Sequence, residues 1–279
     1  MNISRQAHDQ HCRRQQLFDL KVHELLYQVD LIREEHPSMA MRTIYSMLQP
    51  DWIGSNRFEK LLIKNGYRLK RRISFCKTTR RGGRWREFSN LVNGLLINNI
   101  NQVWVTDITY FLVNGKFCYI FLLMDVYSRR ILGHKASLNM YSVTAFETLK
   151  MALKNRKIQK YNGSLIHHSD RGSQYMSDVY IKLVQSKEIL ISICDNVYEN
   201  AHMERVNGII KNHYLIFRTI NNLEDLKIEL DRAVIAYNVN KPHDSLLKKM
   251  SPYHFEKHIL SLNTQNRPMF NLYRGSCKK

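Results

Sequence analysis

Leu165-Ile166-His167-His168-Ser169-Asp170-Arg171-Gly172-Ser173-Gln174-Tyr175 is the segment around which the rest of the chain is arranged. Its first five residues are an apolar, β-prone run, and the run ends abruptly at a carboxylate. The Arg-Gly-Ser that follows is typical of a turn, so the pattern predicts a strand that ends at Asp170. We therefore expect the Asp170 side chain to be displayed at the C-terminal edge of a strand rather than buried in its middle.

Two further carboxylates lie on segments with a clear hydrophobic period. Residues 103–111 alternate as in a strand, which places Asp107 in a row of apolar side chains. Because an isolated ionised carboxylate in a core-facing row is costly, we expect Asp107 where that row opens onto a site. Residues 200–214 have a helical period, with Glu204 outside the apolar stripe. The stripe is Met203, Val206 and Ile210, and the other face is Asn200, Glu204, Asn207 and Lys211.

Two strand carboxylates and one helix carboxylate could together hold divalent cations through oxygen ligands, as Mg²⁺ requires. This is the arrangement used in two-metal phosphoryl chemistry. Asp125 also ends an expected strand, but the neighbouring Ser128-Arg129 predicts a turn-capping or Arg-pairing role for it instead.

Composition favours a folded protein that binds a polyanion. The chain has 279 residues, 44% of them hydrophobic, which suits one large domain or two smaller ones. Lys and Arg number 43 against 24 Asp and Glu, a formal charge of +19 that favours nucleic acid ahead of an anionic membrane surface. Five scattered Cys without a CxxC pair indicate neither disulfides nor zinc, and a reducing cytoplasm fits best. The longest apolar run, residues 117–124, is too short to cross a bilayer, so we expect neither export nor membrane insertion.

Residues 16–72 have the pattern of three helices. The first ends at His36-Pro37-Ser38, the second covers residues 39–48, and the third covers residues 56–65 before Gly66. Short helices joined by a turn suit a helix-turn-helix reader of DNA, and they suit a plain helical bundle equally well. The candidate DNA contacts on the third helix are Arg57, Lys60 and Lys64.

A strongly basic stretch follows these helices. From Lys60 to Arg86 there are eleven basic residues and no acid. Residues 78–86 combine the glycines of a linker with a charge suited to following phosphates, which would add affinity that falls steeply with salt. A solvated linker without DNA contact is the alternative. The candidate contacts here are Arg71, Arg72, Arg80, Arg81, Arg84 and Arg86.

From residue 102 onward the pattern becomes α/β. Three consecutive antiparallel strands are followed by alternating helices and strands, which predicts a mixed sheet with helices on both sides. The expected strands are residues 103–113, 116–126, 131–137, 165–170 and 189–194. The expected helices are residues 142–155, 178–187, 200–214 and 223–240, with a last short helix from Tyr253.

Five ordered blocks of this sequence resemble the catalytic subunit of bacterial insertion-sequence transposases of the two-reading-frame type, whose second frame encodes a retroviral-integrase-like core. The blocks are Trp104-Val105-Thr106-Asp107-Ile108-Thr109-Tyr110, Asp125 to Gly133, His168 to Tyr175, Tyr198-Glu199-Asn200-Ala201 leading to Glu204, and Tyr237-Asn238 leading to Pro242-His243, Ser245-Leu246 and Ser251-Pro252. The resemblance implies a ribonuclease-H-like fold in which Asp107, Asp170 and Glu204 are the acidic triad. The expected regions are 1–72, helix-turn-helix-like; 73–100, a basic linker; 101–218, the ribonuclease-H-like core; and 219–279, a C-terminal helical extension of that core.

The implied function is a DNA transposase that cleaves insertion-sequence ends and joins them to target DNA, with two Mg²⁺ ions that Mn²⁺ can replace. Lys211 is a candidate phosphate or end-base contact, and Arg171 and Asn200 are candidates to orient the carboxylates. The implied partners are double-stranded DNA, further copies of this chain on paired ends, and a small upstream-frame helix-turn-helix protein, at the nucleoid of a bacterial cytoplasm. The alternatives are a related two-metal nuclease that cuts without joining, and a catalytically inactive DNA-binding remnant.

Overall fold

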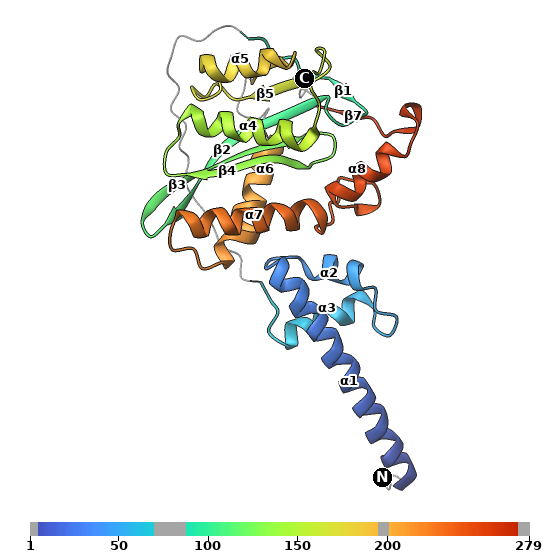
Figure 1. Ribbon diagram of the computed structural model, residues 1–279. Coiled ribbons are helices and arrows are strands. Elements are labelled where there is room, and N and C mark those ends of the chain that lie inside the picture. Colours follow the sequence, from blue (N-terminus) through green and yellow to red (C-terminus); the bar gives the residue numbers. More distant parts are fainter. Residues whose placement is uncertain (1–4, 70–87, 195–200, 273–279) are drawn as a thin grey trace, which may run out of the picture. The chain divides into compact units, whose positions relative to one another are not determined.

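In the computed structural model, which describes residues 5–69, 88–194 and 201–272, the chain divides into two units, Met1–Ile73 and Ser74–Lys279. The described part of the first unit is helical (Figure 1), with α1 (Arg5–Glu35), α2 (Met41–Leu48) and α3 (Ser55–Lys64). These are the predicted helices. However, α1 begins well before the predicted start, because residues 5–16 are mostly charged and amide side chains that favour a helix without an apolar period.

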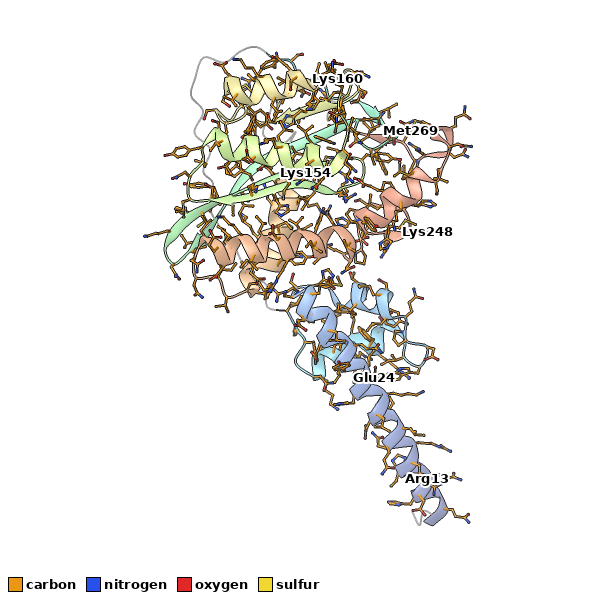
Figure 2. All side chains as sticks on the ribbon, viewed as in Figure 1. Arg13, Glu24, Lys154, Lys160, Lys248 and Met269 are labelled. Atoms are coloured by element: carbon orange, nitrogen blue, oxygen red, sulfur yellow. The ribbon has the colours of Figure 1, made fainter. Side chains whose placement is uncertain are left out.

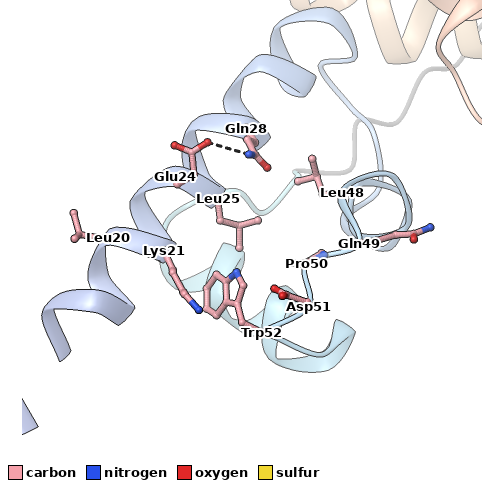
Figure 3. Close-up of a pocket in the computed structure, with 10 residues that line it drawn as sticks. All are labelled: Leu20, Lys21, Glu24, Leu25, Gln28, Leu48, Gln49, Pro50, Asp51 and Trp52. Atoms are coloured by element: carbon pink, nitrogen blue, oxygen red, sulfur yellow. Dashed lines mark hydrogen bonds between the residues drawn. The ribbon is translucent and has the colours of Figure 1, made fainter. Parts of the chain in front are cut away.

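Apolar side chains from all three helices form the core of the first unit. They are Leu25, Val29, Met39, Ile44, Ile53, Phe58 and Leu62. The N-terminal half of α1 extends beyond this core, and Arg13 projects from it (Figure 2). Figure 3 shows the hollow between α1 and the turn at residues 49–52, with Trp52 in its lining. Trp52 also meets Phe18 edge-on at a ring-centroid distance of 5.6 Å. A DNA-binding helix-turn-helix and a plain helical bundle would both pack in this way, so the helix-turn-helix remains a prediction.

The second unit is built on a five-stranded sheet with the strand order β4-β3-β2-β5-β6. β2, β3 and β4 are antiparallel, whereas β5 runs parallel to β2 and β6 runs parallel to β5. The strands are β2 (Val103–Val113), β3 (Lys116–Asp125), β4 (Ile131–Ser137), β5 (Ile166–Ser169) and β6 (Leu190–Ile193). This order confirms the predicted antiparallel meander followed by alternating strands and helices.

Helices cover both faces of this sheet (Figure 1). Trp104 and Phe121 pack with α4 (Ser142–Arg156) and α5 (Asp178–Ser186). The opposite face, which includes Val105, packs with α6 (Ala201–Ile209), α7 (Leu223–Val239) and α8 (Pro252–Leu260). A π-helical turn (Ile210–Tyr214) continues α6, and 3-10 turns occupy Leu215–Phe217, Leu247–Lys249 and Thr264–Asn266. The fold is therefore the predicted ribonuclease-H-like one. Within the described ranges, no helix is both long and apolar enough to cross a bilayer.

A small second sheet was not predicted. β1 (Leu96–Ile97) pairs antiparallel with β7 (Phe270–Asn271), and Val92 and Ile97 are buried in the core of the second unit. These residues fall in ranges expected to be a linker and a helical extension. Two-residue strands are too short to show an alternating pattern, so their pairing comes from the tertiary contact alone.

Asp125 has the structural role that its neighbours predict. One carboxylate oxygen accepts hydrogen bonds from the backbone N–H groups of Tyr127 (3.0 Å) and Ser128 (3.1 Å). The other oxygen accepts from Asn101 N (2.7 Å) and from Arg156 Nη2 (3.1 Å). Asp125 is fully buried and so caps the turn after β3 as the prediction states, although its arginine partner is on α4.

Gly133 on β4 is expected to be indispensable for packing. A Cβ atom added there would lie 2.2 Å from the backbone oxygen of Thr148 on α4. We expect Gly133→Ala to lower the free energy of unfolding by roughly 1–3 kcal/mol, measured by urea denaturation, because β4 and α4 must separate. Gly208→Ala is the matched control: nothing lies within 4 Å of its added Cβ, and the helix gains up to about 1 kcal/mol. Equal midpoints for Gly133→Ala and wild type would contradict the close contact.

Candidate active site

The register between β2 and β5 places two carboxylates side by side. Val105 on β2 is opposite His168 on β5. Two residues further along, the chain reaches Asp107 on β2 and, just after the end of β5, Asp170. Adjacent strands lie about 4.8 Å apart, so the two carboxylates are neighbours at the point where β2 loses its parallel partner. The prediction that Asp170 follows the end of a strand is confirmed.

The turn after β5 fixes the orientation of Asp170. Its Oδ1 accepts a hydrogen bond from the backbone N–H of Gly172 at 3.0 Å. A Cβ atom on Gly172 would lie 3.0 Å from the same oxygen, so a glycine fits this close approach. The turn is tied to β2 by buried Tyr175, whose hydroxyl lies 3.3 Å from Oγ1 of Thr106. The side chain next to Asp107 in the chain therefore anchors the loop that carries Asp170.

α6 brings the third carboxylate to this pair. Its apolar stripe is buried against the sheet as predicted, and Nδ2 of Asn207 donates a hydrogen bond to Oδ2 of Asp107 at 2.7 Å. Glu204 lies almost one turn earlier on α6 and is exposed to solvent. Its charge contributes to the raised pKa of Asp107. The structure thus gathers Asp107, Asp170 and Glu204 in one region.

Asp107 and Asp170 are in an environment that disfavours their negative charge. Burial raises the pKa of Asp107 to about 7, and the nearby charges of Asp170 and Glu204 raise it too, while hydrogen bonds from the Ile108 N–H and Asn207 oppose them. Burial also raises the pKa of Asp170, against the hydrogen bond from the Gly172 N–H. A bound cation would remove this penalty, because it favours the ionised form of every carboxylate around it.

The donor set suits a hard divalent cation. It consists of three carboxylates and the Oδ1 atom of Asn207, which is buried without a hydrogen-bond partner in the described part of the chain. Mg²⁺ and Mn²⁺ prefer such oxygen ligands, whereas zinc sites are usually built from Cys and His. Among the described residues, no three His, Cys, Asp or Glu side chains already surround one point closely enough to hold a metal ion. Cation binding would therefore have to draw the carboxylates together.

Lys211 reaches the same region from the π-helical turn that continues α6. Its Nζ lies 4.9 Å from the centre of the Tyr110 ring. Burial lowers the pKa of Lys211, and the negative charge of Asp107 opposes this shift. π-Helical turns often occur at functional sites, and here the turn ends the helix that carries Glu204.

The remaining predicted contacts are only partly placed by the structure. Arg171 is exposed on the turn beside Asp170. The predicted contacts on α3, Arg57, Lys60 and Lys64, are all exposed. Outside the described residues lie Asn200, Arg71, Arg72, Arg80, Arg81, Arg84 and Arg86. The assigned roles of all these residues remain predictions.

Sequence reasoning missed two residues that shape the site. The sequence pattern places Asn207 on the same helix face as Glu204 but assigns it no function. Its spacing of three residues from Glu204 could have suggested that Asn207 also faces the site. Tyr175 lies in the quoted segment, yet only the tertiary structure shows its contact with Thr106.

Two family models, both described as integrase core domain, match residues 98–197 and 195–252. An insertion element IS600 protein of Shigella sonnei is 31% identical over 209 residues, which cover 74% of this chain and 75% of that protein. The putative transposase of IS986/IS6110 from Mycobacterium tuberculosis is 29% identical, covering 50% of this chain and 51% of that protein. The IS629 transposase of Shigella sonnei is also 29% identical, covering 50% of this chain and 46% of that protein.

Among solved structures, the HTLV-2 integrase catalytic core domain in complex with magnesium is similar to this chain. It is 17% identical, with a TM-score of 0.43, and the match covers 60% of this chain and 99% of that one. Among the sequence relatives, this chain spans three quarters of the length of the IS600 protein and about half of the length of each of the two transposases.

Proposed function

This chain belongs to the insertion-sequence transposases with an integrase core, and from that premise we propose that it cleaves the DNA ends of its element and joins them to target DNA. The observation that carries the proposal is that Asp107 and Asp170 each lie two residues beyond the Val105–His168 pair of β2 and β5, with Glu204 on the neighbouring α6. Phosphoryl transfer needs little covalent chemistry from the protein; it needs positioned groups that neutralise charge on the reacting phosphate.

Asp107, Asp170 and Glu204 would hold the two Mg²⁺ ions, which Mn²⁺ can replace. When bound, such ions activate the attacking oxygen and stabilise the leaving oxygen of an in-line displacement. Two observations support a divalent cation at this site. All the available donor atoms are oxygens, and a bound cation would lower the raised pKa of Asp107.

Neighbouring side chains would keep the carboxylates in place during the reaction. The Gly172 N–H holds Oδ1 of Asp170, and Asn207 holds Oδ2 of Asp107. Lys211 would contact a phosphate or an end base next to the reacting one, since its ammonium lies within electrostatic reach of Asp107. Arg171 and Asn200 are proposed to help orient the carboxylates.

We expect Asn207→Ala to weaken activity about 10- to 100-fold, chiefly by raising the Mg²⁺ concentration needed, because Asp107 loses the group that orients it. The measurement is strand transfer against Mg²⁺ concentration. Asn212→Ala is the matched control, because Asn212 is an exposed asparagine in the turn that follows α6. Equal Mg²⁺ dependence for wild type and Asn207→Ala would remove Asn207 from this role.

The proposed substrate is double-stranded DNA, and the net charge of +19 supports it. The basic residues of α3 and of the segment up to Arg86 would bind DNA outside the reacting ends. We further propose that copies of this chain assemble on paired element ends and that a small upstream-frame helix-turn-helix protein can take part.

The test is strand transfer with wild-type protein on a labelled duplex that carries the terminal sequence of the parent element and a recessed 3′-hydroxyl. Joined product in Mg²⁺ or Mn²⁺, and none in EDTA, is the expected result. Cutting without joining would instead identify a two-metal nuclease, and DNA binding without either reaction would identify an inactive remnant.

A further inference from the structure

Basic and imidazole side chains from separate parts of the chain gather beside α6, and the proposed reaction does not yet use them. We call them the α6-flank cluster, which comprises Arg129, Arg205, Lys241 and His243. Arg129 lies in the turn between β3 and β4, Arg205 lies on α6, and the other two follow the end of α7. Arg129 contacts α6 directly, because its Nη1 atom lies 2.9 Å from Nδ1 of His202 on that helix.

His243 is held rigidly in the middle of this cluster. Its side chain is 8% exposed, and its ring meets the Tyr237 ring edge-on at a centroid distance of 4.7 Å. Its backbone N–H donates to the Met250 carbonyl at 3.3 Å. Nevertheless, its Nε2 atom is buried without a hydrogen-bond partner in the part of the chain that the structure describes. Such an unsatisfied nitrogen is costly and indicates a site that is completed by another molecule.

The charges around His243 are predominantly positive. The pKa of His243 is lowered to about 3, chiefly by burial and also by the positive charges of Lys241, Arg129 and Arg205, while the negative charge of Asp244 opposes the shift. The ring is therefore neutral and carries one N–H. Asp244 is highly exposed and already pairs with Lys249 at 3.3 Å. Positive charges held this close together repel one another, and an anion between them would relieve that repulsion.

The α6-flank cluster and the carboxylates lie on different sides of α6. His202 lies near Arg129, Asn207 contacts Asp107, and Lys211 follows near the other end. At about 100° per residue, Asn207 and Lys211 share one face of the helix, whereas His202 lies about 140° away from Asn207 around it. A phosphate bound at the cluster is therefore not the one at the carboxylates.

We propose that the α6-flank cluster binds one backbone phosphate of the DNA, away from the phosphate at the carboxylates. This inference rests on the proposed function. The ammonium of Lys241 and the guanidinium of the exposed Arg205 contact the phosphate oxygens, and His243 forms the floor of the site.

The first test measures binding of Lys241→Ala to a duplex with the terminal sequence of the parent element, in EDTA so that no reaction occurs. We expect affinity to fall roughly tenfold at moderate salt, and the slope of log affinity against log salt to decrease by about one, as for the loss of one phosphate contact. Lys248→Ala is the matched control, because this exposed lysine lies a few residues away in the same segment (Figure 2) and should bind as wild type does. Lys241→Arg should restore most of the affinity, and thermal melting checks that all variants are folded.

The second test neutralises single phosphates of the same duplex with methylphosphonates near the cleavage position. We expect one position other than the cleavage site at which the substitution weakens wild-type binding but does not weaken Lys241→Ala any further. Equal DNA affinity of wild type, Lys241→Ala and Lys248→Ala would overturn the phosphate site. The site would also be overturned if every methylphosphonate weakened the binding of Lys241→Ala as much as it weakens the binding of the wild type. Absence of salt-dependent DNA binding by the wild type would instead overturn the proposed function, and this inference with it.

Discussion

Replacing Glu204 by Gln is expected to lower strand transfer at least about a thousandfold while DNA affinity stays as in the wild type. The carboxylate is proposed to hold metal ions that stabilise several kcal/mol of developing charge in the transition state, and each 1.36 kcal/mol is a factor of ten in rate. An amide has nearly the same size but no charge. Asp107→Asn is expected to give the same loss, because the charges of both other carboxylates act on Asp107, as expected for ligands of one metal site.

The measurement compares joined product with DNA binding in the same preparations. Glu224→Gln is the control, because Glu224 is an exposed carboxylate in the first turn of α7, paired with Lys227 at 2.7 Å. It should join DNA at the wild-type rate. Joining that survives Glu204→Gln would remove Glu204 from the triad. Loss of DNA binding in Glu204→Gln would show that the helix, rather than the chemistry, had been changed.

Glu256→Ala is expected to have the largest effect on stability, lowering the free energy of unfolding by about 3–5 kcal/mol. Glu256 on α8 is 4% exposed and accepts hydrogen bonds from Arg130 Nη1 (2.6 Å), Arg156 Nη2 (2.6 Å) and Ser128 Oγ (2.7 Å). Among the described residues, removing the Glu256 carboxylate leaves Asp125 as the remaining ion-pair partner of the buried Arg156 guanidinium. The same change loosens the attachment of α8 to the turn after β3.

Urea denaturation checks this expectation. Burial raises the pKa of Glu256, but the hydrogen bonds and charges of Arg156, Ser128 and Arg130 outweigh burial and hold it below the ordinary value of 4.5. The contribution of Glu256 is therefore present above pH 4.5 and is lost as the pH falls through its lowered pKa. The control is Glu147→Ala, whose exposed pair with Lys150 at 3.3 Å contributes at most about 1 kcal/mol. If Glu256→Ala and Glu147→Ala were equally stable, the buried network would not anchor α8.

Much of the fold follows from short-range patterns. The alternation of residues 103–113, the Asn-Gly turn after them and the apolar stripe of residues 200–214 each predict an element that the structure contains. Helix boundaries are mispredicted where the sequence has no hydrophobic period, as at the start of α1. The two-residue strands β1 and β7 are not predicted at all. The positions of Asp107, Asp170 and Glu204 on strands and a helix suggested metal binding, and the resemblance between blocks assigned these residues to an acidic triad. How the three carboxylates come together appears only in the folded chain.

The chain order of strands and helices, the position of Asp170 after a strand and the helical face of Glu204 could be read from residues a few positions apart, because backbone geometry repeats every two or 3.6 residues. Other contacts join residues that are 36 to 112 positions apart in the chain. They are the pairing of Val105 with His168, the hydrogen bond from Asn207 to Asp107, and the gathering of Arg129, Arg205 and Lys241. No local period encodes such contacts. They arise when the sheet register and the packing of α6 and α7 on one face bury the apolar side chains, and the polar groups are then fixed wherever that packing leaves them.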